Sequence, residues 1–145
     1  MKSMLVPVDL SNAAPGVVSA AVALAKPMGV EIVLLHVTAP EPEFVGYDPG
    51  PQSVRDAIAR QFAGEKHALE VVEAGVRSQG IPVRALVIQG LPAEKILAEA
   101  KKLDAAMIVL GSHGHGMLHH LLVGSVAEGV IRKSTCPVLI VPHRG

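Results

Sequence analysis

The chain contains very few aromatic residues. They make up 2 % of its 145 residues, and tryptophan is absent, although 50 % of the residues are hydrophobic. The core must therefore be built from aliphatic side chains, as is typical of parallel sheets that helices cover on both faces. A chain of this length buries roughly two thirds of its unfolded surface as one ordinary domain. We therefore expect a single domain over residues 1–145.

The chain also lacks any excess of charge. Its 13 basic residues balance 13 acidic residues, and no basic run is longer than two. This balance argues against a partner that is a nucleic-acid backbone or an anionic membrane. The single cysteine, Cys136, cannot form an internal disulfide, and it precedes an apolar run. We expect it to be a small buried hydrophobic residue rather than a reactive thiol.

Long apolar runs are missing as well. No apolar stretch approaches the roughly 18 residues of a membrane-spanning helix. Asp9 stands near the N-terminus, where a secretory signal would be apolar. The sequence therefore predicts a cytoplasmic protein.

Short aliphatic runs alternate with longer stretches of helical periodicity. The predicted strands cover residues 4–8, 31–37, 83–88, 107–110 and 138–141. The predicted helices run from Ser11 or Asn12 to Met28 and over residues 53–78, 92–103 and 126–133, and residues 38–51 read as a loop. Gly64 and Gly75 weaken the second helix pattern. The alternation predicts a three-layer α/β fold with right-handed crossovers around a parallel sheet.

Two of the predicted strands end in residues suited to a ligand site. Asp9 follows the first strand, and the fourth strand runs into Gly111-x2-Gly114-x9-Gly124-Ser125. Glycine lacks a Cβ and permits positive φ, so successive N–H groups can converge on one anion. The helix that follows adds unpaired N–H groups and its positive dipole end. In open α/β sheets ligands bind where the strand order reverses, so the motif predicts a phosphate site there.

Other phosphate-binding and hydrolytic motifs do not fit. A P-loop needs lysine after its second glycine, where this chain has Met117. A dinucleotide fingerprint that starts at Gly114 fails at His119. Neither Ser112 nor Ser125 stands in the G-x-S-x-G pattern of a nucleophile elbow. These devices are therefore not expected to supply hydrolysis.

Four histidines crowd the interior of the glycine motif, namely His113, His115, His119 and His120. They could form a transition-metal site or a polar cover over the phosphates. The cover is favoured because no cysteine or acid lies within the cluster. Asp9 and phosphate oxygens could instead share a divalent cation, Mg²⁺ or Mn²⁺. His36, His67 and His143 are expected to be structural or exposed.

Taken in order, these segments resemble the universal stress proteins of the UspA type, in their ATP-binding branch. The matching segments are Val-Pro-Val-Asp at 6–9, Leu-Leu-His-Val at 34–37, Gly-Leu-Pro-Ala-Glu at 90–94, the complete glycine motif, and Cys-Pro-Val-Leu-Ile-Val at 136–141. The resemblance implies a Rossmann-like fold of the adenine nucleotide alpha hydrolase type, with strand order 3-2-1-4-5. It also implies a homodimer joined through the last strand, residues 138–141.

The resemblance further implies an adenine-nucleotide site. Asp9 would meet the ribose or adenine side, and the backbone of Val37 would contact adenine. The phosphates would lie against residues of the motif and the next helix, with strand-end neighbours alongside: Gly111, His113, Gly114, Gly124, Ser125 and Val126, with Pro7, Val8 and Leu110.

The expected function is that of an ATP- or AMP-binding regulatory protein of the stress response. Two alternatives stay open at this point. One is a slow ATPase or phosphotransferase, for which His113 and Asp9 are the only candidate groups. The other is a scaffold that binds no nucleotide.

Overall fold

The computed structural model describes residues 1–10, 14–39, 51–112 and 123–143, and strands and helices alternate through them. The strands are β1 (Ser3–Pro7), β2 (Glu31–Thr38), β3 (Val83–Gln89), β4 (Met107–Gly111) and β5 (Val138–Val141). The helices are α1 (Ala14–Met28), α2 (Gln52–Arg77), α3 (Pro92–Leu103) and α4 (Ser125–Lys133). The predicted elements are all present, and their ends differ by at most one residue where both are described. The residues proposed to cap α1, Ser11 and Asn12, lie outside the described part.

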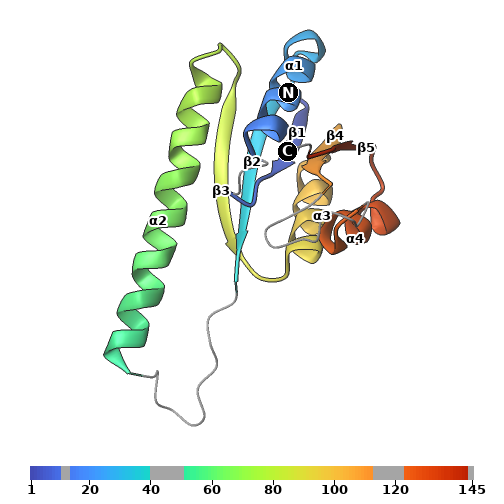
Figure 1. Ribbon diagram of the computed structural model, residues 1–145. Coiled ribbons are helices and arrows are strands. Elements are labelled where there is room, and N and C mark those ends of the chain that lie inside the picture. The colour runs from blue at the N-terminus through green and yellow to red at the C-terminus, as the bar shows by residue number, and fades with distance from the viewer. Residues whose placement is uncertain (11–13, 40–50, 113–122, 144–145) are drawn as a thin grey trace.

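The strands form one parallel sheet in the order β3-β2-β1-β4-β5, as predicted. Leu5 of β1 lies level with Val33 on one side and Ile108 on the other. Helices α1 and α2 cover one face, and α3 and α4 cover the other (Figure 1). The strand order reverses between β1 and β4, so their carboxyl ends meet at the switch point where such sheets bind ligands.

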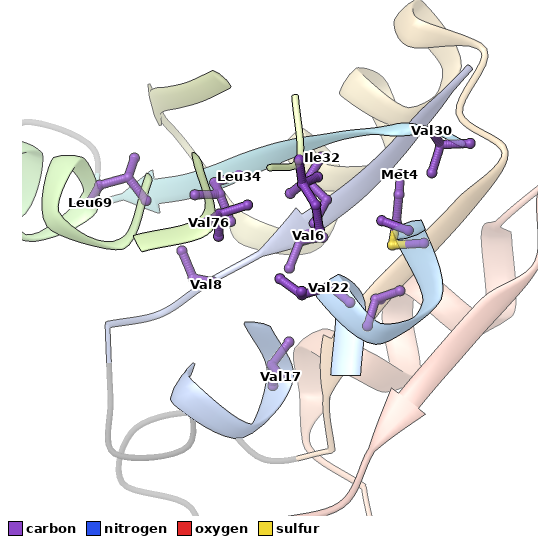
Figure 2. Close-up of a cluster of buried hydrophobic side chains, with 14 residues drawn as sticks. Met4, Val6, Val8, Val17, Val22, Val30, Ile32, Leu34, Leu69 and Val76 are labelled. Carbon is purple, nitrogen blue, oxygen red and sulfur yellow. The ribbon is translucent and has the colours of Figure 1, made fainter. Parts of the chain in front are cut away.

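Each face of the sheet has its own aliphatic core. Successive residues of a strand point to opposite faces, so Leu34 packs with Leu69 of α2 (Figure 2) while Leu35 packs with Ile96 of α3. Full burial of one such side chain contributes about 1.5–3 kcal/mol relative to exposure. Cys136 is only partly buried, at the edge of the second core. The expectation of a buried cysteine is therefore correct only in part.

Helix α2 runs unbroken through Gly64 and Gly75, the two glycines that weakened its predicted helical pattern. Each glycine costs a helix about 1 kcal/mol relative to alanine. The buried residues of α2, Leu69 and Val76, both lie in its C-terminal half. Their packing on the sheet compensates for the cost of the two glycines. The first turns of α2 extend past the end of the sheet in Figure 1. Among the described helices, none is long and apolar enough to cross a membrane.

Candidate functional site

A cavity of about 340 Å³ opens at the carboxyl ends of β1, β2 and β4. Every proposed nucleotide-binding residue that the structure describes lines it: Pro7, Val8, Asp9, Val37, Leu110, Gly111, Gly124, Ser125 and Val126. His113 and Gly114 lie outside the described residues. The strand ends on both sides of the switch point therefore face one cavity, as the topology predicts.

The cavity has further walls that the sequence reading did not assign to it. Helices α1, α3 and α4 and strand β2 contribute apolar residues, and two polar residues come from β2 and from the position directly after β4: Ala14, Val17, Leu35, His36, Pro92, Ile96, Ser112 and Ala127. The volume falls at the lower end of the range of small-molecule sites, about 300–1,000 Å³. A mostly apolar cavity with a few polar groups at its rim suits a flat organic ring that carries polar substituents.

The exit of β1 is held in an unusual conformation. The Val8 N–H donates to the Leu35 carbonyl at 2.9 Å, and the Val8 carbonyl lies 2.9 Å from His36 Nδ1. Two residues later, Leu10 has a φ of 61°, a left-handed conformation that costs a non-glycine residue about 1–2 kcal/mol. Asp9 lies between Val8 and Leu10, and the turn places it at the cavity.

Hydrogen bonds tie the start of the glycine motif to β5 and to the end of the motif. The Ser112 N–H donates to the Val141 carbonyl at 3.0 Å, and the Gly124 N–H donates to the Ser112 carbonyl at 2.6 Å. Neither Gly111 nor Gly124 has a positive φ, so the argument from left-handed backbone is wrong for these two positions. Gly124 has φ −74° and ψ 165°, which any residue adopts. Because Gly124 is buried beside the cavity, its contribution is the absence of a side chain.

Helix α4 begins at the cavity with its N-terminus. Its first intrahelical bond runs from the Glu128 N–H to the Gly124 carbonyl at 2.9 Å, so the N–H groups of Ser125, Val126 and Ala127 precede the hydrogen-bonded ladder. All three residues line the cavity. Gly124 occupies the N-cap position, and Ser125 is the first residue of the helix. Unpaired N–H groups and a positive dipole end are suited to an anion.

A buried polar cluster lies directly behind the exit of β1. His36 is 7 % exposed, and its Nε2 lies 3.2 Å from Glu65 Oε2 on α2. Both atoms are buried, and the contact is an ion pair when the imidazole is protonated. Burial raises the pKa of Glu65, but hydrogen bonds from Thr38 and Gln61 and the charge of His36 outweigh it, and the pKa lies below its ordinary value.

The histidines fall into distinct environments. His67 and His143 are exposed, while His36 is buried at the cavity. The four histidines of the glycine motif, His113, His115, His119 and His120, lie outside the described residues. Within the described part of the chain, no group of three or more histidine, cysteine or acidic residues is placed to hold a metal ion. Any metal at this cavity would therefore need ligands beyond Asp9.

Comparison with known proteins agrees with this geometry. The profile of the Universal stress protein family matches residues 1–142. The chain belongs to the universal stress protein family. It is 33 % identical to Universal stress protein YxiE of Bacillus subtilis, over 95 % of this chain and 97 % of that protein. It is 25 % identical to the structure of UspA from Lactobacillus plantarum, with a TM-score of 0.84 and 97 % of each chain covered.

Two more distant structures share the fold of this universal stress protein and contain nucleotides. One is a universal stress protein in complex with cAMP, at 20 % identity and a TM-score of 0.70, covering 97 % of this chain and 96 % of that one. The other is the universal stress protein from Archaeoglobus fulgidus in complex with dAMP, at 23 % identity and a TM-score of 0.68, covering 97 % of each chain.

Proposed function

We propose that this universal stress protein binds an adenine nucleotide, ATP or AMP, at the switch-point cavity and acts as a cytoplasmic regulator of the stress response. The observation that carries the proposal is the meeting, in one cavity, of the N-terminus of α4 with Asp9 and Val37. A nucleotide needs all three kinds of group: donors for phosphate, an acceptor for ribose hydroxyls, and backbone that can pair with a base. The cAMP and dAMP complexes of two proteins with this fold support the same ligand class.

The parts of the nucleotide can be assigned by their chemistry. The adenine ring suits the apolar side of the cavity near Val37 and Ile96, and the ribose suits the carboxylate of Asp9. The phosphates suit the N–H groups of Ser125 and Val126, together with Gly111 and Gly124 and the proposed ligands His113 and Gly114. Bound nucleotide would join β4, α4 and the exit of β1, and through them would change conformation, dimerisation or the choice of partner.

Asp9 and the phosphate oxygens fit a divalent cation, Mg²⁺ or Mn²⁺. These ions are commonly held by one or two carboxylates plus phosphate oxygens, with water completing the shell. In this arrangement the cation would neutralise phosphate charge beside Asp9, which would otherwise repel it. The affinity for ATP should therefore fall when EDTA removes divalent cations.

Strand β5 is proposed as the homodimer interface. It lies at the edge of the sheet, where it pairs with β4 on one side, and its residues Val138–Val141 are all only partly buried. An apolar edge strand of this kind is open to pairing with another chain. Sedimentation equilibrium should therefore give a dimer, and a monomer at all concentrations would contradict this assignment.

Equilibrium dialysis with labelled ATP tests nucleotide binding directly. In Gly124→Val the added side chain should fill the space beside the N-terminus of α4 and abolish binding. The matched control is Gly64→Val on α2, where a new Cβ meets nothing within 4 Å and binding should equal that of the wild type. If Gly124→Val and the wild type bind ATP equally, the assignment is wrong.

A further inference from the structure

We propose that His36 is the positioning residue of the nucleotide cavity: held by Glu65, it fixes the Val8 carbonyl and so the turn that carries Asp9. The proposal rests on the proposed function, because it concerns how that cavity keeps its affinity. It makes nucleotide affinity depend on a side chain that need not touch the phosphates. It also connects the cavity to helix α2.

The geometry places His36 at the centre of a chain of three contacts. Nδ1 lies 2.9 Å from the Val8 carbonyl, and Nε2 lies 3.2 Å from Glu65 Oε2. Glu65 belongs to α2 and does not line the cavity, whereas Val8 and His36 do. The imidazole ring therefore bridges α2 and the exit of β1.

The contact with Val8 fixes a ring proton on Nδ1. A carbonyl oxygen accepts and never donates, so Nδ1 must carry a proton to bond Val8. Nε2 and Glu65 Oε2 lie 3.2 Å apart, and both atoms are shielded from water. Because the pKa of Glu65 is lowered, this carboxylate stays ionised near neutrality and is placed to hold the ring in that orientation.

Loss of the Nδ1 donor should release the Val8 carbonyl, and the turn should shift. Leu10 sits in a strained left-handed conformation, so this turn has a lower-energy conformation to relax toward.

The charged groups around the ring are few in the described structure. Glu65 approaches it from α2, Asp9 lines the same cavity from the end of β1, and its own strand contributes the uncharged Thr38 beside Glu65. Nucleotide affinity should consequently depend on the donor that the ring presents to the Val8 carbonyl.

The test is the affinity for cAMP, a probe whose phosphodiester carries a single charge. Loss of the donor to Val8 should raise the dissociation constant about five-fold or more, the equivalent of one hydrogen bond. In Glu65→Gln the ring can keep its proton on Nδ1 while the new amide donates to Nε2, so the affinity should stay close to that of the wild type.

Two side-chain replacements at His36 separate its two contacts. Asparagine places its amide nitrogen near the Nδ1 position and keeps a donor for Val8, so His36→Asn should bind cAMP well. Glutamine places its nitrogen near the Nε2 position and keeps only the contact with Glu65, so His36→Gln should bind weakly. Equal binding by these two variants would overturn the proposal.

A readout without ligand keeps this proposal distinct from nucleotide binding itself. In the free protein the amide resonances of Asp9 and Leu10 should move away from their wild-type positions in His36→Gln and stay close to them in His36→Asn. If these shifts occur but cAMP and ATP do not bind, the proposed function is wrong and the positioning role stands. If nucleotide binds but the amide resonances are the same in both variants, the positioning role is wrong.

Discussion

The two ends of the sheet are built differently. At the amino ends of the strands, polar side chains pair with one another: Ser3 Oγ donates to Glu31 at 2.9 Å, and Arg84 reaches the same carboxylate at 3.3 Å. At the carboxyl ends, by contrast, the N-terminus of α4 faces a cavity that also contains Asp9. Both ends belong to the same strands and share the same core.

The backbone follows the same division at the two turns that flank α1. On the amino side of the sheet, the turn from α1 into β2 uses Gly29 with φ 66°, a conformation that glycine adopts without strain. On the carboxyl side, the turn out of β1 uses Leu10 with φ 61°. Strain held by a surrounding network is typical of ligand sites. Of the two turns that flank α1, the one with the strained residue is the one beside the cavity.

The largest expected effect at the amino end follows from Glu31→Ala. The substitution removes the acceptor of the Ser3 hydroxyl, which belongs to a residue only 4 % exposed. An unsatisfied buried polar group costs about 1–3 kcal/mol, and urea unfolding should report that loss. Glu31→Gln keeps an acceptor and should lose less. Nucleotide affinity should be unchanged in both variants, and a matching loss of affinity would show that the two ends are not independent.

A smaller effect of about 1 kcal/mol is expected from Gly29→Ala, because alanine is strained at positive φ. The control is Gly64→Ala in α2, where the added methyl meets nothing within 4 Å and should raise stability by about 0.5–1 kcal/mol. Thermal unfolding of both variants measures the two opposite shifts. Two shifts of the same sign would contradict the assigned backbone conformations.

The smallest effect concerns Glu65 in acid. Its pKa lies below the ordinary value of 4.5, so its ionised form stabilises the folded state above that value, and the contribution is lost as the pH falls through the folded-state pKa. The free energy of unfolding of the wild type, measured in urea, should therefore fall relative to that of Glu65→Gln between about pH 5 and 3, the range that spans carboxyl titration. The control is Glu70→Gln, at an exposed position of the same helix. The difference in unfolding free energy between this variant and the wild type should not change over that range.

The strands and their order could be predicted because continuous aliphatic runs, separated by helical patterns, permit few topologies. The placement of the glycine motif beside Asp9 followed from the same reasoning, since both come directly after strands. Positive φ at Gly111 and Gly124 was a wrong inference from composition. Glycine is also used where a side chain would occupy needed space, and sequence alone does not distinguish the two uses.

The role of His36 could not be predicted from its surroundings in the chain. Its partner Glu65 lies on α2, far along the sequence, and the contact depends on how that helix is rotated and shifted against β2. The apolar residues that line the cavity could not be predicted for a related reason. Ile96 has the helical spacing of a core residue, and the same spacing serves a side chain that lines a cavity.

An amide NMR titration with ATP in the presence of Mg²⁺ tests the central claim most directly, because it compares the two ends in one experiment. We expect the resonances of Asp9, Val37, Gly111 and Val126 to shift together in a saturable way, while that of Glu31 at the amino end stays fixed. Shifts that concentrate at the amino end, or no saturable shift at the four cavity residues, would contradict nucleotide binding at the switch point.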